Sequence, residues 1–143
     1  MVAEKHLEAN GYSRIDLPMM EYQGLFEKGI GESSEIVEKQ MFVIPSKKED
    51  RDLVLRPEGT AGAVRAYLEH GMQALPQPVL LYYIGPMFRK ESPQQDRWRQ
   101  HYQFGVEVIG TDKMSSDAQV IKVIWDILND LGFKKLTVKI NSI

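Results

Sequence analysis

Apolar residues recur with the spacing of an α-helix in three parts of the chain, at 2–10, 60–70 and 116–131. The first helix is expected to end at Gly11, because glycine is favoured at the position that follows a helix. The second is expected to begin with Thr60 as its N-cap. We expect it to pack through one apolar face, made of Ala61, Val64 and Leu68.

The helix at 116–131 is expected to begin with Ser116 as its N-cap and to end at Gly132. Its predicted buried stripe consists of Ile121, Ile124, Trp125, Leu128 and Leu131. A glycine-containing segment at 22–37 has no clean period, and we expect it to be partly helical and mobile.

Extended segments follow from short apolar runs bounded by turn residues, at 12–17, 41–44, 53–55, 79–84, 102–109 and 137–143. Pro18 is expected to end the first of them, and a charged turn at 47–52 joins the second to the third. The run at 79–84 is apolar throughout, as in a strand buried on both faces. The order of elements is neither a βαβ alternation nor all-β, so the sequence predicts an α+β fold with a mainly antiparallel sheet.

The composition is that of an ordinary globular domain: 143 residues, 43% hydrophobic, 27% charged and a net charge of −2. The chain has no cysteine, which excludes disulfides, thiolate metal sites and a cysteine nucleophile. No apolar run approaches the ~20 residues of a membrane span and no signal peptide is evident, so we expect a cytoplasmic protein without a membrane partner. Because the chain begins within a helix and ends within a predicted strand, we expect it to be part of a longer protein.

Polar side chains follow one face of the predicted strand at 102–109. With a period of two, Gln103, Gly105 and Glu107 share a face. That face continues upstream through Arg97, Arg99 and His101, while Phe104, Val106 and Val108 point to the core. An amide, a missing side chain and a carboxylate in succession predict a floor on which a ligand lies, with Gly105 leaving the space. The alternatives are a solvated sheet face and a glycine that marks a β-bulge.

Arginines gather around the connection between the strands at 79–84 and 102–109. The guanidinium forks of Arg89, Arg97 and Arg99 could bind a polyphosphate bidentately. The alternative is surface ion pairing with Glu91 and Asp96, worth about 0–1 kcal/mol for each pair.

Glu58 lies just before a predicted helix start. It could complement the helix dipole, the better interpretation from the pattern alone, or bind a ligand ammonium group. His6 and His70 have no metal-ligand spacing, and we expect no metal-binding residues in the chain.

The chain closely resembles the histidyl-tRNA synthetases. The resemblance rests on RPEGT at 56–60, YIGPMFR at 83–89 and the run 97–110, together with 11–18 and 25–41. It covers essentially the whole chain in order and corresponds to the first two signature motifs of the class II aminoacyl-tRNA synthetases. It implies a class II synthetase-like catalytic domain, with a six-stranded antiparallel sheet flanked by helices. It also implies a homodimer formed through the first motif, around Pro18.

On the histidine side, the resemblance implies that Glu58 and Thr60 hold the α-amino group of the substrate, assisted by Gln103. Glu107 matches the carboxylate that accepts a hydrogen bond from the imidazole ring. On the nucleotide side, Arg89 matches the catalytic arginine that contacts the α-phosphate of ATP and the histidine carboxylate. The further ATP-binding positions are Glu91, Arg97, Arg99 and His101.

Three positions depart from the family pattern. His101 stands where the class usually has an aromatic residue on adenine. Ser92 stands where the family often has a basic residue, and Asp96 where it often has glycine, which leaves a less basic loop. The family's histidine-specific arginine motif, its third class motif and its anticodon-binding domain would all follow Ile143. Residues 1–143 are therefore expected to be a partial catalytic domain.

The resemblance implies a histidine–tRNA ligase. Such an enzyme activates histidine with ATP and Mg²⁺ to histidyl-adenylate and transfers it to tRNA(His), without a protein general base. This piece alone is expected to be weak or inactive. One alternative is a histidine-sensing regulatory subunit of ATP phosphoribosyltransferase, which tends to lose the 56–60 stretch and the set Arg89, Glu91 and Arg97. Another is a piece that dimerises and binds nothing tightly.

Overall fold

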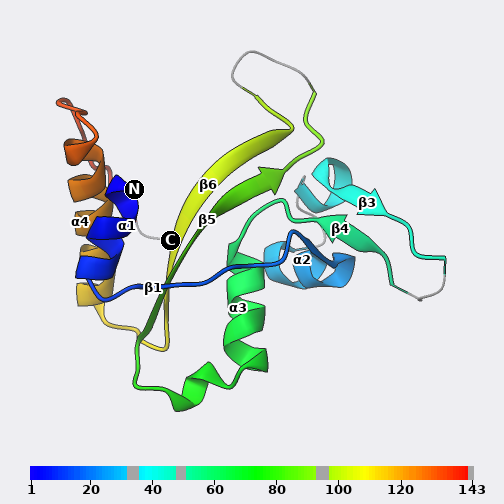
Figure 1. Cartoon of the computed structure of the whole chain (residues 1–143), viewed down its shortest axis with the longest axis horizontal. Coiled ribbons are helices and arrows are strands. Elements are labelled where there is room, and N and C mark those ends of the chain that lie inside the picture. Colours follow the sequence, from blue (N-terminus) through cyan, green and yellow to red (C-terminus); the bar gives the residue numbers. More distant parts are fainter. Residues whose placement is uncertain (32–35, 48–50, 93–96, 142–143) are drawn as a thin grey trace.

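The computed structural model describes residues 1–31, 36–47, 51–92 and 97–141 (Figure 1). Two helices lie near the ends of the chain, α1 (Val2–Ala9) and α4 (Met114–Asp130), and two lie between them, α2 (Gln23–Ile30) and α3 (Thr60–Glu69). A π-helical turn, η1 (Ile36–Gln40), and a 3₁₀ turn, η2 (Met72–Ala74), are also present. The strands are β1 (Ser13–Arg14), β2 (Met20–Tyr22), β3 (Phe42–Ile44), β4 (Leu53–Leu55), β5 (Val79–Phe88) and β6 (Gln100–Ile109).

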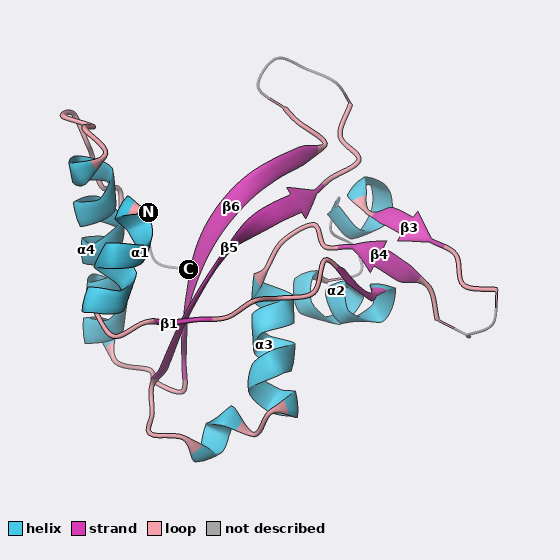
Figure 2. Cartoon of the chain, viewed as in Figure 1, coloured by secondary structure: helices cyan, strands magenta, loops and turns pink. Residues whose placement is uncertain are grey.

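The strands of the described residues form two three-stranded sheets, in the orders β1-β5-β6 and β2-β4-β3 (Figure 2). The long hairpin of β5 and β6 is antiparallel, with Val79 opposite Ile109 and Phe88 opposite Gln100. The second sheet is antiparallel throughout, whereas β1 pairs parallel with β5. The mainly antiparallel α+β arrangement predicted from the sequence is confirmed, although the six strands lie in two sheets.

Helices cover both faces of the β5–β6 hairpin (Figure 1). On one face, α1 and α4 lie side by side over Tyr82, and Leu7 and Ile127 are fully buried there. On the other face, Ala63 of α3 packs with Tyr83 and Met87. The β5 strand is therefore buried on both sides, as its continuous apolar run predicted. One face of β6 lies beside the amino terminus of α3.

The end of α1 is as the sequence predicted. Gly11 has a positive φ of 84°, its N–H donates to the Glu8 carbonyl, and the N–H of Tyr12 donates to the Leu7 carbonyl. These two bonds form a Schellman motif, which satisfies carbonyls that the last helical turn leaves without a partner.

The predicted cap of α3 is wrong, and its predicted packing face is right for Ala61 but wrong for Val64 and Leu68. Its N-cap is Gly59, without a side-chain cap bond, and Thr60 is the first helical residue. The buried residues are the small ones, Ala61, Gly62, Ala63 and Ala66, while Val64 and Leu68 are 40% and 60% exposed. Of the small residues, Ala63 packs against Tyr83 and Met87 of β5. The larger apolar residues of α3 line a groove of about 490 Å³ beside Leu25 and Gly29 of α2.

The predicted start and buried stripe of α4 are also shifted. The helix begins at Met114 with Lys113 as N-cap, so Ser116 lies inside the first turn. Val123 and Ile127 are the buried residues, whereas Trp125 and Leu131 are 40% and 54% exposed. The helix is therefore rotated on the sheet from the predicted stripe, because packing against α1 favours the Val123–Ile127 line.

Extended segments form strands only where a partner lies beside them. Of the predicted strand at 12–17, only Ser13–Arg14 pairs with β5. Residues 137–141 form no strand, and 142–143 lie outside the described residues, so the predicted strand at 137–143 is wrong over its described part. The strands at 41–44 and 53–55 are confirmed, although part of the turn between them, 48–50, is not described. Among the described residues, no helix is both long and apolar enough to cross a bilayer.

Candidate active site

Three side chains from three elements meet at the Glu107 carboxylate. Glu107 lies on β6, and its Oε1 accepts a hydrogen bond of 2.9 Å from the Thr60 hydroxyl at the start of α3. The same oxygen accepts a bond of 3.3 Å from the hydroxyl of Tyr83 on β5. The carboxylate is thus held in one orientation by two hydroxyl donors, and Oε2 remains for a further donor.

Tyr83 occupies the space that two glycines leave. A Cβ on Gly105 would lie 2.3 Å from the Tyr83 Cζ, and a Cβ on Gly59 would lie equally close to the same atom. The sequence predicted that Gly105 leaves room for a ligand; the structure shows that this room is taken by the Tyr83 ring. Gly105 pairs with Tyr83 across the β5–β6 ladder, so both lie on the face toward α3. Nothing in the sequence pattern assigned Tyr83 a role in the site.

Burial shifts the ionisation of both groups toward the neutral form. It raises the pKa of Tyr83 to about 12, so the hydroxyl stays protonated and donates at neutral pH. Burial also raises the pKa of Glu107, against the lowering effect of the bonds from Thr60 and Tyr83, and the nearby charge of Glu58 raises it further. Two carboxylates near one another in a partly buried place form a site that favours a cation or a donor N–H.

Glu58 caps α3. Its carboxylate accepts hydrogen bonds from the backbone N–H of Thr60 and from that of Ala61, the latter at 3.0 Å. This arrangement matches the helix-capping alternative from the sequence, and it also places the negative charge of Glu58 beside Glu107. Gln103 lies on the same face of β6, opposite Gly85, and is partly exposed.

Arg89 follows the end of β5. Its Nε donates to the carbonyl of Pro57 at 3.0 Å, and its backbone N–H donates to the carbonyl of Arg99 at 2.9 Å. Within the described part of the chain, its two terminal nitrogens have no hydrogen-bond or ion-pair partner. His101 lies nearby on β6, and burial lowers its pKa, with a further lowering from the charge of Arg89. The neutral imidazole ring of His101 and the guanidinium of Arg89 therefore lie near each other at the loop end of the β5–β6 hairpin.

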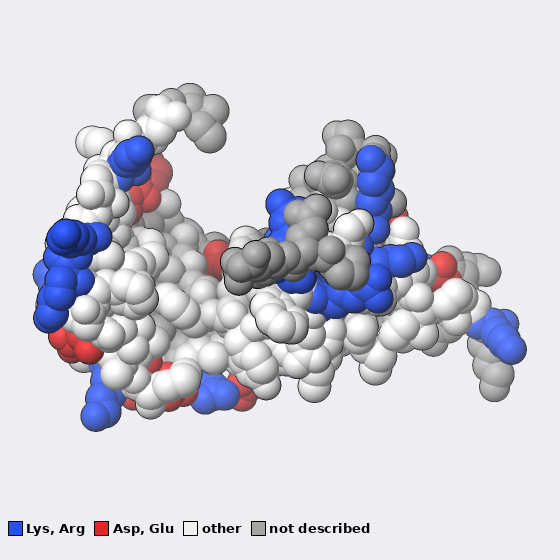
Figure 3. All heavy atoms as spheres, turned by 90° about the horizontal axis from the view of Figure 1, so that it is seen from above, with Lys and Arg blue, Asp and Glu red and all other residues white. Residues whose placement is uncertain are grey.

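The remaining predicted nucleotide-side residues interact with one another. Arg97 and Glu91 form an ion pair of 3.5 Å, and the Nε of Arg99 donates to the Glu91 carbonyl at 3.4 Å. Glu91 Oε2 is buried without a hydrogen bond. The Arg97–Glu91 pair is the ion pairing that the sequence left open as an alternative. Asp96, the other possible partner, lies outside the described residues. Lys and Arg side chains gather beside the hairpin loop, next to a hollow in the surface (Figure 3).

One strand face thus connects two kinds of chemistry. From His101 to Glu107 the chain advances by six residue steps along β6, about 20 Å at the rise of a strand. The Glu107 end offers acceptors and the His101 end offers a cation that is free to bind oxygen atoms. An elongated ligand with a cationic group at one end and an anionic group beyond it fits this order.

Comparison with known proteins identifies the family. The family model described as histidyl-tRNA synthetase matches residues 3–143. The chain belongs to the histidyl-tRNA synthetase family. A histidine–tRNA ligase from Desulfitobacterium hafniense is 52% identical over 133 residues, which are 93% of this chain and 31% of that protein. The chain spans about a third of the length of the curated relatives it matches.

Solved structures agree with the family. The apo histidyl-tRNA synthetase of S. aureus superimposes with a TM-score of 0.74 at 39% identity, over 92% of this chain and 29% of that one. A Bacillus halodurans protein described as an ATP phosphoribosyltransferase regulatory subunit/histidyl-tRNA synthetase gives 0.75 at 28% identity, over 94% of this chain and 33% of that one. The predicted class II synthetase-like fold is thereby confirmed.

Proposed function

We propose that this chain is the part of a histidine–tRNA ligase that contains the first two class motifs and binds histidine and ATP. The observation that carries the proposal is the polar face of β6. The hydrogen-bonded Glu107 carboxylate lies at one end, and at the other lie the terminal nitrogens of Arg89, which have no partner among the described residues. Membership of the family supports the choice of histidine as the amino acid.

On the histidine side, Glu107 would accept a hydrogen bond from the imidazole ring through the oxygen that neither hydroxyl occupies. Glu58, Thr60 and Gln103 would surround the α-ammonium group. Two neighbouring carboxylates favour that cation over a neutral group, and the Thr60 hydroxyl keeps Glu107 in place.

On the nucleotide side, Arg89 would bind the α-phosphate of ATP and the histidine carboxylate through its two terminal nitrogens. An oxygen of that carboxylate attacks the α-phosphorus, the bond to the β-phosphate breaks, and pyrophosphate leaves. Arg89 stabilises the added charge, while its Nε bond to Pro57 keeps the fork fixed. No proton has to be removed from the attacking carboxylate, so a protein base is not needed.

The neutral ring of His101 would lie against adenine, with Arg97 and Arg99 near the phosphates. Mg²⁺ is normally bound through ATP phosphates and one or two carboxylates. Glu91 would be the protein carboxylate for it: its buried Oε2 accepts no hydrogen bond among the described residues and pairs only with the Arg97 guanidinium, at 3.5 Å. When bound, the ion would neutralise phosphate charge.

The test is histidine-dependent exchange of pyrophosphate into ATP, measured on the longer protein that contains this chain. Exchange should require histidine, and no other amino acid should replace it. Failure to exchange under saturating histidine and ATP would contradict the ligase. We propose that this chain alone exchanges pyrophosphate at least ~10³-fold more slowly, since the arginines expected after Ile143 would be missing.

The partners follow from the same proposal: tRNA(His) in the longer protein, a second copy of the chain through the segment around Pro18, and a cytoplasmic location. A regulatory subunit of ATP phosphoribosyltransferase is the second candidate, because the Bacillus halodurans structure carries both descriptions. The intact Arg89, Glu91 and Arg97 set favours the ligase. Histidine binding without any pyrophosphate exchange would support the regulatory subunit instead.

A further inference from the structure

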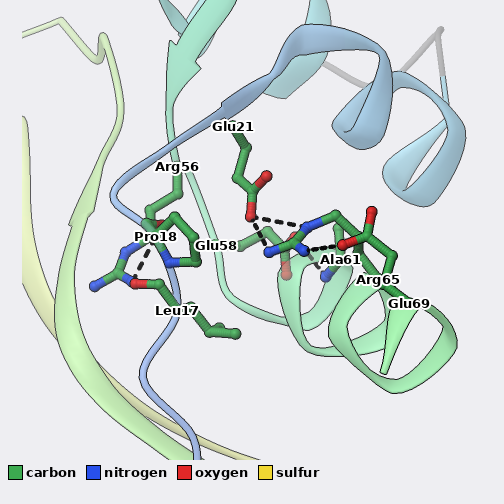
Figure 4. A network of polar contacts seen from close by, with 8 residues as sticks. All are labelled: Leu17, Pro18, Glu21, Arg56, Glu58, Ala61, Arg65 and Glu69. Carbon is green, nitrogen blue, oxygen red and sulfur yellow. Dashed lines mark hydrogen bonds and ion pairs between the residues drawn. The ribbon is translucent and has the colours of Figure 1, made fainter. Parts of the chain in front are cut away.

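Arg56 is a buried charged residue that the proposed reaction does not use. It is 6% exposed. Its Nε donates to the carbonyl of Pro86 on β5 at 2.9 Å. Its Nη1 donates to the carbonyls of Leu17 at 2.6 Å and Pro18 at 3.4 Å (Figure 4). The side chain therefore joins two segments that lie far apart in the sequence.

The residues around the Arg56 guanidinium leave space for it. A Cβ on Gly85 would lie 2.4 Å from the Nη2 of Arg56, so the glycine leaves the space for the fork. Among the described residues, no carboxylate forms an ion pair with Arg56, and burial lowers its pKa. Arginine keeps its charge nonetheless. The charges of Asp16 and Glu21 act on Arg56 without forming an ion pair with it, and the side-chain hydrogen bonds that Arg56 makes within the described residues all go to backbone carbonyls. Each of these bonds that is lost leaves a buried N–H of the cation without an acceptor, which restricts where the side chain can lie.

The backbone of Arg56 is tied to the same two segments. Its N–H donates to the carbonyl of Met19 at 2.9 Å, and its carbonyl accepts from the N–H of Phe88 at 3.0 Å. The next residue in the chain, Pro57, provides the carbonyl that accepts from Arg89. The position of Arg56 thus determines where the acceptor for Arg89 lies.

We propose that Arg56 is a positioning residue that fixes the Arg89 guanidinium through the carbonyl of Pro57. Arg56 does not touch the proposed substrate site. It locks the 56–58 backbone between β5 and the Leu17–Pro18 segment, and Arg89 uses this backbone as its support. The expected effect of Arg56 on ATP binding rests on the proposed function. Its expected effect on the orientation of Arg89 is independent of that function.

The test compares two variants with a matched control. Arg56→Lys keeps the charge, but its single nitrogen cannot occupy both the Nε and the Nη1 positions from which Arg56 donates to Pro86 and Leu17. Gly85→Ala keeps Arg56 and crowds its Nη2. The control is Arg65→Lys: Arg65 is a partly buried arginine of α3 that pairs with Glu21 and Glu69 at 2.6 Å each. Arg65 pairs with Glu21 and Glu69 (Figure 4), whereas Arg89 donates to Pro57, so the two residues share no partner among the described residues.

Two measurements are made on the chain: the ¹⁵N-detected Nε–H signal of Arg89, and the affinity for ATP by calorimetry. Both variants at Arg56 and Gly85 should shift the Arg89 signal and weaken ATP binding about tenfold or more, because misplacing a positioned group has a large effect. The control should lose thermal stability without either change. An Arg89 signal that moves no more in these variants than in the control would overturn the inference.

The inference and the proposed function fail in different ways. A wild-type chain that binds no ATP contradicts nucleotide binding by this chain, while the Arg89 signal still decides the role of Arg56. ATP binding that survives unchanged in a folded Arg56→Lys chain rejects the positioning role alone. If Arg56→Lys does not fold, Gly85→Ala carries both measurements, and the same two results decide.

Discussion

Replacing Gly105 by alanine tests the placement of Tyr83 in the site. The new Cβ would lie 2.3 Å from the Tyr83 Cζ, whereas an ordinary carbon–carbon contact is about 3.5 Å. The ring or the β6 backbone must therefore move by about 1.2 Å. Overpacking of this kind typically destabilises a protein by about 1–3 kcal/mol. For a domain of this size, that lowers the unfolding midpoint by roughly 3–10 °C.

The matched control for this variant is Gly24→Ala in α2. A Cβ there meets only the Glu27 carboxylate, at 3.8 Å, so the substitution should be neutral or slightly stabilising. Thermal unfolding of the three chains, followed by circular dichroism, gives the comparison. The Gly105→Ala chain should also bind histidine more weakly, because the Tyr83 hydroxyl moves away from Glu107. A Gly105→Ala chain as stable as the wild type would show that Tyr83 does not fill this space.

Three further predictions concern charge and assembly. Burial raises the pKa of Glu107, so the ligand-free wild type should lose stability relative to Glu107→Gln as pH rises above about 4.5. Urea unfolding of both chains at about pH 4 and about pH 8 measures this. An equal difference in unfolding free energy between the two chains at both pH values would contradict it. Arg89→Lys in the longer protein should slow pyrophosphate exchange about 10²–10³-fold, because a single nitrogen cannot stand both at the Nε position that bonds Pro57 and at the two terminal positions that face the substrates. Retention of most of the rate would count against the assignment. Sedimentation at ~100 µM should show a species of twice 16.4 kDa, since Met19 and Met20 expose apolar surface at 55% and 52%; a monomer alone would argue against a dimer through Pro18.

Features set by neighbouring residues were predictable from the sequence. Gly11 ends α1 because the backbone there has a positive φ, which depends on the chain nearby. The cap made by Glu58 is equally local, since its partners are two and three residues away. The apolar run of β5 and the alternation of β6 gave the hairpin and the shared face of Gln103, Gly105 and Glu107.

Features set by contacts between distant segments were not predictable. The strand expected at 137–143 requires a partner that the described residues do not provide. The buried face of α3 follows from how closely Ala63 approaches β5, while the amphipathic pattern gave more weight to Val64 and Leu68. Tyr83 reads as one more apolar residue of a buried run, and its role depends on glycines 24 and 22 positions away.

The same distinction applies to the site as a whole. The resemblance named Glu58, Thr60, Gln103 and Glu107 for histidine, and these roles remain predictions. The structure adds the contact between Thr60 and Glu107, across 47 positions of sequence, and the support of Arg89 by Pro57. A signal for Tyr83 was present in principle, because glycines at 59 and 105 leave room for a large neighbouring ring.

The most direct test of the account is a calorimetric titration of amino acids into the longer protein, in the wild type and in Glu107→Gln. The wild type should bind histidine at least about 100-fold more tightly than phenylalanine, which has a ring of similar shape but no N–H. Glu107→Gln should weaken histidine binding about 10²-fold, the loss of one charge-assisted hydrogen bond, and should leave ATP affinity unchanged. Equal affinity for histidine and phenylalanine, or undiminished histidine binding by Glu107→Gln, would contradict the account.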